Sequence, residues 1–185
     1  MPGETVFFFG GARTDTSPWK FLSQWYPSPF RGEDGSVIYK TAEQYMMHQK
    51  ALLFSDADVA ARILLAETPK EQKALGRQVK NFDEDIWIAN RLRIVTEGSY
   101  HKFMHGLQDN TDLRDKLLAT ENRELVEAAP RDKIWGIGFS ATNAEKNRQK
   151  WGQNLLGKAL MEVRDQIREE VKEADARVPD IKVGR

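Results

Sequence analysis

The sequence contains no cysteine and only three histidines among its 185 residues. The lack of cysteine excludes disulfide bonds, thiol nucleophiles and zinc–thiolate sites, and it fits a reducing compartment. Basic and acidic residues number 28 each, so no general electrostatic field draws the chain to nucleic acid or to an acidic membrane. No apolar run approaches the roughly 18 residues that a membrane-spanning helix needs. We therefore expect a cytoplasmic protein, with the nucleus as the alternative, that makes no membrane contact.

Familiar motifs of metal and nucleotide chemistry are missing as well. There is no HExxH pair, no GxSxG elbow and no Walker loop. His101 and His105 stand one helical turn apart, but the sequence suggests no third ligand for a metal ion. The sequence thus predicts an activity that uses neither a metal nor another cofactor.

The residues that are present predict one α+β domain that is predominantly α-helical. Short β-prone runs occur at residues 6–9 and 37–39, and a segment rich in proline and aromatic residues separates them. Apolar periodicity and cap residues predict helices at 42–54, 56–66, 69–76, 84–106, 110–119, 121–127 and 144–172. We expect a single compact domain over residues 1–172, with a few short strands and aromatic loops packed on the helical body. Residues 173–185 hold few apolar anchors and are expected to fray.

Two of these helices have a readable buried face. In the helix at 84–106, Trp87 is expected to flank the core, and Lys102 to extend along apolar surface with its ammonium in water. The buried face of that helix is expected to consist of Ile88, Leu92, Val95, Ser99 and Phe103. The last helix is expected to bury Gly152, Leu156, Leu160, Val163 and Ile167.

The decapeptide at residues 41–50 carries the first functional signal. Thr41 and Gln44 have the spacing of a capping box, which starts a helix. Glu43 and Lys50 then lie on one face, about 10 Å apart along the helix axis. A carboxylate in the first helical turn is also favoured by the helix dipole alone, so a purely structural role for Glu43 stays open.

Two glycine-containing segments supply further candidates. Gly76 and Arg77 read either as a C-cap glycine with a surface arginine or as a site for a phosphate or carboxylate. Trp135 and Gly136 lie in a loop that combines an aromatic platform with a backbone able to approach a ligand closely. Asp132, just before them, is either a turn carboxylate or a group that accepts a proton or a sugar hydroxyl.

Together these residues suit cleavage of a bond between a sugar and a flat heterocycle. Such a reaction passes through an oxocarbenium-like state, which needs a carboxylate near C1 and an acid that helps the base to leave. Glu43 and Asp132 are the candidate carboxylates, and Trp87 and Trp135 the candidate platforms for the base. The amine of Lys50 adds a second route, in which it forms a Schiff base with the opened sugar.

The order of the motifs resembles that of a known family. The matching segments are residues 8–10, 21–30, 39–45, 50–51, 76–77, 87, 102–103, 117–120, 125–127, 132–138 and 154–161. They are similar to the NADAR family (NAD- and ADP-ribose-associated), also described as YbiA-like riboflavin-intermediate N-glycosidases, from about residue 6 to residue 168. Two departures stand out: Ser23-Gln24-Trp25 replaces the family's Ser-Asn-Phe, and Glu43-Gln44-Tyr45 replaces its Glu-His-Tyr.

The resemblance implies an α-rich domain that hydrolyses N-glycosidic bonds. Its substrates would be ribosylated pyrimidine phosphates of early riboflavin synthesis or ADP-ribose attached to guanine, including guanine within nucleic acid. By position, the catalytic residues would be Glu43, Lys50 and Asp132. Substrate contacts would come from Phe9, Gly10, Arg13, Ser23, Gln24, Gly76, Arg77, Trp87, Trp135 and Gly136.

Two other functions are compatible with the same sequence. The pocket could bind ADP-ribose or a related nucleotide without turnover, or the chain could be a structural helical protein that has lost its activity. Arg13, Arg31 and Arg77 are each candidates for a phosphate contact, and their spacing does not separate one phosphate from a pyrophosphate. The sequence leaves the oligomeric state open.

Overall fold

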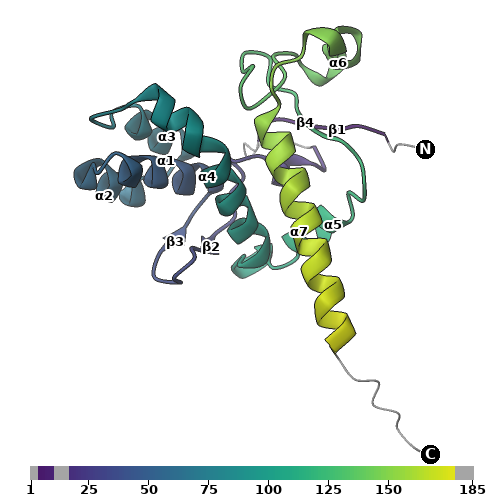
Figure 1. The fold of residues 1–185 in the computed structure, drawn as a ribbon, viewed down its shortest axis with the longest axis horizontal. Coiled ribbons are helices and arrows are strands. Elements are labelled where there is room, and N and C mark those ends of the chain that lie inside the picture. The colour runs from purple at the N-terminus through teal and green to yellow at the C-terminus, as the bar shows by residue number, and fades with distance from the viewer. Residues whose placement is uncertain (1–3, 11–16, 178–185) are drawn as a thin grey trace, which may run out of the picture.

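The computed structural model describes residues 4–10 and 17–177, except for the side chain of Asp109. A helical body forms around α1 (Ala42–Leu53), which contacts α2 (Ala57–Leu65), α3 (Pro69–Gly76) and α4 (Glu84–Met104). α4 lies between this group and α7 (Leu155–Arg177), as Figure 1 shows. The predicted class, an α-rich α+β domain, is therefore confirmed.

Most of the helices in this body begin at a side chain that caps the backbone. Thr41 Oγ1 accepts the N–H of Gln44 at 3.1 Å, as the capping-box spacing predicts. The side chain of Gln44 completes the box in a different way, because its oxygen accepts the N–H of Lys40 at 2.7 Å. Asp56, Thr68 and Asp83 cap α2, α3 and α4 in the same manner. The four helix starts are thus fixed by local sequence.

Two small sheets complete the framework. β1 (Val6–Phe8) pairs in parallel with β4 (Leu125–Glu127), which places Phe8 opposite Glu127. β2 (Phe30–Arg31) and β3 (Ile38–Tyr39) form an antiparallel pair. The remaining elements are α5 (Leu113–Leu118), α6 (Ala141–Ala144) and 3-10 turns at Lys20–Leu22, Gln108–Asn110 and Glu145–Lys150.

The helix predicted at 121–127 was wrong, because its second half forms β4. The helix predicted at 144–172 was also wrong at both ends. α7 begins at Leu155 and continues to Arg177, so residues 173–177 are helical, whereas 178–185 lie outside the described residues. Gly152 precedes α7 and packs against the backbone of Lys133, at a distance that leaves no room for a Cβ.

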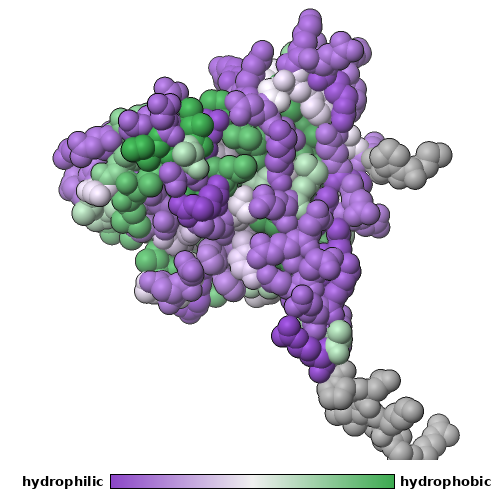
Figure 2. Space-filling model, viewed as in Figure 1, coloured by the Kyte–Doolittle hydropathy of each residue, from purple (hydrophilic) through white to green (hydrophobic). Residues whose placement is uncertain are grey.

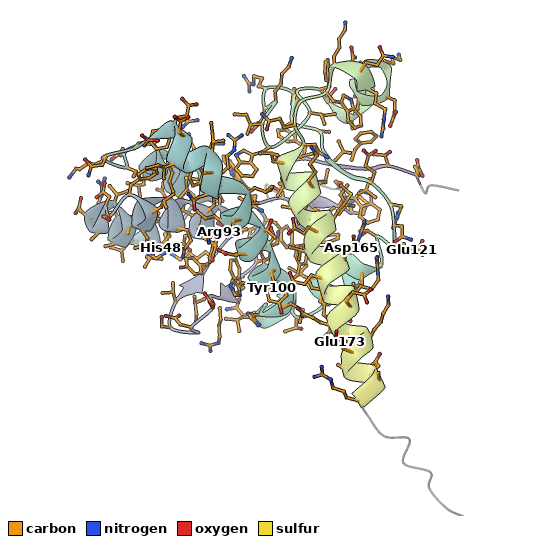
Figure 3. The ribbon with its side chains drawn as sticks, viewed as in Figure 1. His48, Arg93, Tyr100, Glu121, Asp165 and Glu173 are labelled. Atoms are coloured by element: carbon orange, nitrogen blue, oxygen red, sulfur yellow. The ribbon has the colours of Figure 1, made fainter. Side chains whose placement is uncertain are left out.

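The buried faces were predicted in part. On α4, Val95, Ser99 and Phe103 are buried, but Ile88 and Leu92, in the first half of the helix, are exposed. Figure 2 shows hydrophobic residues gathered on the surface around α1 and α4. On α7 the other four residues of the predicted face are buried, namely Leu156, Leu160, Val163 and Ile167. Tyr100 of α4 donates a hydrogen bond to Glu170 of α7 at 2.9 Å, where the two helices lie side by side (Figure 3).

The prediction for Lys102 was wrong. Its side chain is fully buried, and Nζ donates to the carbonyl oxygens of Phe21 and Ser23 at 2.6 and 2.8 Å. Burial lowers the pKa of Lys102 to about 7. The residue fastens the aromatic segment at 17–30 to α4. No helix within the described ranges is long and apolar enough to cross a bilayer.

Replacing Lys102 tests this attachment. Lys102→Met keeps the volume and the apolar stem but leaves two buried carbonyl oxygens without a donor. We expect the free energy of unfolding to fall by about 1–3 kcal/mol, measured by urea denaturation at pH 6. Lys158→Met on the exposed side of α7 is the matched control and should change it by less than about 0.5 kcal/mol. Equal stability of the two variants would show that the attachment contributes nothing.

Candidate active site

Glu43 is the most buried charged group at the predicted site. It stands in the first turn of α1, and its N–H donates to the carbonyl of Gln24 at 3.0 Å, which ties the aromatic segment to the helix start. The residue is only 3% exposed, and its Oε1 has no hydrogen-bond partner. Burial raises the pKa of Glu43 to about 7, against the opposing effect of Lys73 and a hydrogen bond with the side chain of Trp25.

The electrostatic neighbours of Glu43 include a second glutamate, which is half-buried. Glu127 ends β4, and its Oε2 is buried without a partner. Burial raises the pKa of Glu127 to about 8, and repulsion by Asp132 and Glu43 adds to this shift. Asp132 also raises the pKa of Glu43, so Glu43, Glu127 and Asp132 form one carboxylate cluster in which each charge acts on a neighbour.

The carboxyl ends of the parallel strands define this place. Phe9 and Gly10 follow β1, and the N–H of Ala128, which follows β4, donates to the carbonyl oxygen of Phe8 at 2.8 Å. Ser23 Oγ donates to the carbonyl of Gly10 at 2.7 Å, so the aromatic segment closes over the same edge. The edge of a parallel sheet where the strands end is a common location for ligand sites in α/β proteins.

Asp132 holds the loop that follows β4. Its Oδ1 accepts the N–H groups of Ile134 and Trp135, both at 2.8 Å, as a turn carboxylate does. Gly136 is needed for the packing of this loop, because a Cβ there would lie 2.7 Å from the carbonyl oxygen of Glu127. Trp135 is half-buried against the main core. Asp132 nevertheless raises the pKa of Glu43, so its charge is felt at the cluster.

Lysine and arginine from α3 face the carboxylates. Lys73 and Arg77 both lower the pKa of Glu43. The ammonium of Lys73 lies 5.8 Å from the centre of the Trp25 ring, and the side chain of Trp25 also forms a hydrogen bond with Glu43. Lys73 is half-buried and Arg77 exposed, so this side of the cluster carries positive charge toward the solvent.

Lys50 lies at the other end of α1 in an aromatic setting. Its Nζ donates to the carbonyl of Gly76 at 2.9 Å and lies 4.3 Å from the ring centre of Phe82 and 5.5 Å from that of Trp87. Burial, and then the charge of Arg77, lower the pKa of Lys50. Arg77 therefore acts electrostatically on both predicted catalytic groups, Glu43 and Lys50.

Gly76 has a different role from the C-cap that was one interpretation of the sequence. It is the last residue of α3, and Arg77 with a φ of −80° is the cap. A Cβ on Gly76 would overlap the sulfur of Met47, so the glycine allows α3 to approach α1. This close approach is what brings the Gly76 carbonyl within reach of Lys50.

The other predicted site residues divide into several groups. Gln24 is buried and donates to Ser99 Oγ at 3.4 Å, which commits its amide to the core. Phe9 is 52% exposed at the end of β1. Arg13 lies outside the described residues. Arg31 donates to the carbonyl of Gly35 at 3.3 Å within its own turn.

Four residues at the site were missed from sequence. Residues 125–127 belong to a segment that matches the family, but Glu127 was not assigned a role because a helix was predicted at 121–127. Lys73, Trp25 and Phe82 meet the others only through tertiary packing. Their spacing along the chain carries no pattern that could have identified them.

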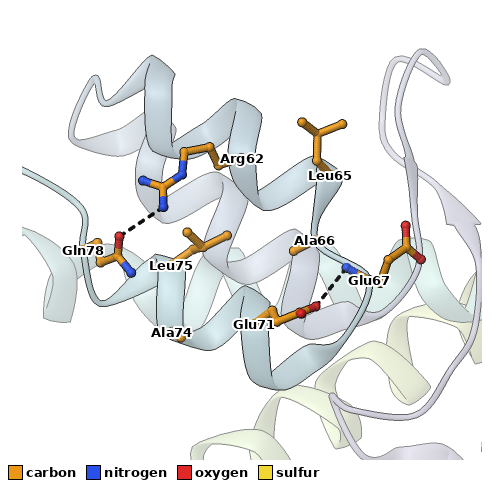
Figure 4. Close-up of a pocket in the computed structure, with 8 residues that line it drawn as sticks. All are labelled: Arg62, Leu65, Ala66, Glu67, Glu71, Ala74, Leu75 and Gln78. Atoms are coloured by element: carbon orange, nitrogen blue, oxygen red, sulfur yellow. Dashed lines mark hydrogen bonds between the residues drawn. The ribbon is translucent and has the colours of Figure 1, made fainter.

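A hollow elsewhere on the surface does not include these groups. It lies between α2 and α3 and is lined by residues such as Arg62, Leu65, Glu71 and Gln78 (Figure 4). Arg62 donates to Gln78 across it at 3.4 Å. Within the described residues, no group of three or more histidine, aspartate or glutamate side chains is arranged to hold a metal ion.

The raised pKa of Glu43 gives a prediction for stability. A carboxyl whose folded pKa is raised stabilises the fold while protonated, and this contribution is lost as the pH rises from about 4.5 through about 7. Glu43→Gln keeps a neutral side chain at every pH, so the variant should gain stability relative to wild type between pH 5 and 8. Urea denaturation at pH 5 and pH 8 measures this difference. A difference between the two proteins that is the same at both pH values would contradict the shift.

Comparison with known proteins shows which family the chain belongs to. The NADAR domain matches residues 7–168. The chain is 42% identical to N-glycosidase R617 of Acanthamoeba polyphaga mimivirus, over 90% of this chain and 98% of that protein. It is 34% identical to N-glycosidase Npun_R5314 of Nostoc punctiforme, over 82% of this chain and 87% of that protein. The fold matches the NMR structure of the E. coli protein YbiA with a TM-score of 0.70 and 26% identity, covering 94% of this chain and 90% of the other. The protein therefore belongs to the NADAR family.

Proposed function

We propose that this protein is an N-glycosidase that releases a base from a phosphorylated or ADP-linked ribose. The observation that carries the proposal is the buried carboxylate of Glu43, whose free oxygen lies in a carboxylate cluster bordered by cations from α3. Two relatives described above are named N-glycosidases. The physiological substrate would be ADP-ribose on guanine, either free or in nucleic acid, or a ribosylated pyrimidine phosphate.

The geometry assigns a role to each side of the site. Ionised Glu43 opposes the positive charge that develops at C1 of the ribose, and its burial strengthens that interaction. Lys73 and Arg77 supply the positive charge that phosphate groups require. Trp87, with Phe82 and Lys50 beside it, and Trp135 on the loop offer surfaces for the flat base. Trp25, Lys73 and Asp132 are half-buried neighbours that interact with Glu43, so we propose that the sugar approaches Glu43 from their side.

Loss of the Glu43 carboxylate should abolish most of the activity. We expect Glu43→Gln to reduce base release by about 100-fold or more, a typical contribution of such a group. The assay follows free base by chromatography with two substrates, ADP-ribosylated guanine and the ribosylamino-pyrimidine phosphate. Glu162→Gln on the exposed face of α7 is the control. Wild-type turnover by Glu43→Gln would refute the mechanism, and calorimetric binding of ADP-ribose without any base release would favour a binding module.

Lys50 is proposed to form a transient imine with the ring-opened sugar. The lowered pKa of Lys50 increases the fraction of free amine, which is the reactive form. In this step the free amine of Lys50 bonds to C1 as the bond from C1 to the base and the bond from C1 to the ring oxygen break. One proton of the amine leaves with the base and the other passes to the ring oxygen, which leaves a C=N bond between C1 and Nζ. Water later adds to this bond, which restores the lysine and releases the sugar as an aldehyde that closes its ring again. Borohydride added during turnover should reduce the imine and leave a covalent sugar adduct on the wild-type protein.

Lys50→Arg serves as the matched variant for this test, because it keeps the positive charge but cannot form the imine. It should show no adduct by mass spectrometry and at least about 100-fold slower turnover. An active wild-type enzyme that gives no adduct would limit Lys50 to orienting the sugar.

A further inference from the structure

Glu127 is a half-buried residue whose carboxylate has no role in the proposed reaction so far. Side chains alternate along β4, so Glu127 faces the same side as Leu125, which is part of the main core, while Val126 packs in the smaller core. Residues of α1 belong to the same main core, and Glu43 raises the pKa of Glu127 through its charge. The Oε2 atom of Glu127 is buried without a hydrogen-bond partner.

Asp132 and Glu127 differ in how their oxygens are engaged. One oxygen of Asp132 accepts two backbone N–H groups, which fixes the loop. That oxygen is therefore engaged in the turn. Glu127 has a buried oxygen free of such donors, next to two other carboxyl groups that discourage its ionisation.

We infer that Glu127 is the general acid that protonates the departing base, with Glu43 opposing the charge at C1 and Asp132 acting as a positioning residue for the loop. This inference rests on the proposed N-glycosidase function. It divides the carboxylates of one cluster into a proton donor, a charge stabiliser and a structural anchor, as environments that push carboxyl pKa values apart do in other enzymes.

The electrostatics of the cluster support this division. Burial raises the pKa of Glu127 to about 8, and the charges of Asp132 and Glu43 add to this shift. Because Glu127 and Glu43 interact, they titrate as a coupled unit, and the pair retains a proton near neutral pH. A general acid works best when its pKa lies near the working pH.

The proton balance of the step is closed. Cleavage of the bond between C1 and the base nitrogen leaves the electron pair on the nitrogen, which takes the proton from Glu127. The oxygen of a water molecule then forms a bond to C1, either directly or after the sugar has formed the imine with Lys50. The proton that this water releases returns to Glu127, so the sum is one water consumed for one base and one ribose released.

Leaving-group ability provides the test. A 4-nitrophenolate group departs without protonation, whereas guanine needs the proton, so we compare ADP-ribosylated guanine with 4-nitrophenyl ADP-ribose. Glu127→Gln should lose about 100-fold or more of the rate on the guanine substrate and less than about fivefold on the nitrophenyl substrate. Glu43→Gln should lose both activities, because both substrates build positive charge at C1.

A pH profile gives a second, independent readout. Wild-type kcat on the guanine substrate should fall as the pH rises above about 8, where Glu127 loses its proton. Glu127→Asp retains an acid at this position, so it should keep the alkaline limb at a shifted pH; this variant also serves if Glu127→Gln does not fold. Glu162→Gln should match wild type with both substrates.

The results that overturn the inference differ from those that overturn the proposed function. If wild type releases guanine but Glu127→Gln stays within threefold of it, or loses both substrates equally, Glu127 is not the acid. A selective loss on the guanine substrate in Asp132→Asn, with Glu127→Gln unaffected, would move the role to Asp132. If wild type releases no base from the guanine substrate or from the ribosylamino-pyrimidine phosphate, the proposed N-glycosidase function itself fails.

Discussion

The structure depends on holding the carboxyl group of Glu43 out of water without giving it a full set of partners. Its backbone N–H is bound by Gln24, yet its Oε1 atom is left free. An unpaired buried polar atom typically costs on the order of 1–3 kcal/mol. The fold tolerates this cost where it raises the pKa of Glu43 to about 7 and leaves an oxygen available for chemistry. Glu127 also has a buried oxygen without a partner, so this cost is carried by two elements, α1 and β4, that are far apart in sequence.

A set of buried polar contacts keeps this cluster in place. Lys102 is fully buried and reaches from α4 to the carbonyl oxygens of Phe21 and Ser23. If the aromatic segment moved away from the helix, the buried amine would lose both of these hydrogen-bond acceptors. Gln44 does the same on the other side of α1, since its amide donates to the backbone carbonyls of Ile63 and Leu64 at the end of α2. Because hydrogen bonds have preferred directions, they restrict the position of Glu43 more than apolar packing alone would.

Local sequence was sufficient to predict the helix starts but not the sheet that completes the site. Thr41, Asp56, Thr68 and Asp83 act within three residues of themselves, so their spacing predicts the caps directly. Residues 121–127 have the polar, leucine-containing composition of a helix. The last three of them form a strand because β1, more than a hundred residues earlier, pairs with them. Glu127 was missed for this reason, whereas Glu43 and Lys50 on one helix could be recognised as a pair.

The order of the chain around the cluster suits a site that separates charge. Carboxylates come from α1, β4 and the loop after it, while Lys73 comes from α3 and Arg77 from its C-cap. Under the proposed function, an anionic phosphate is attracted to Lys73 and Arg77 and repelled by the carboxylates, which favours one orientation of a ribose phosphate. The same distribution of acidic and basic residues would then both select the pose of the substrate and stabilise the charge at C1.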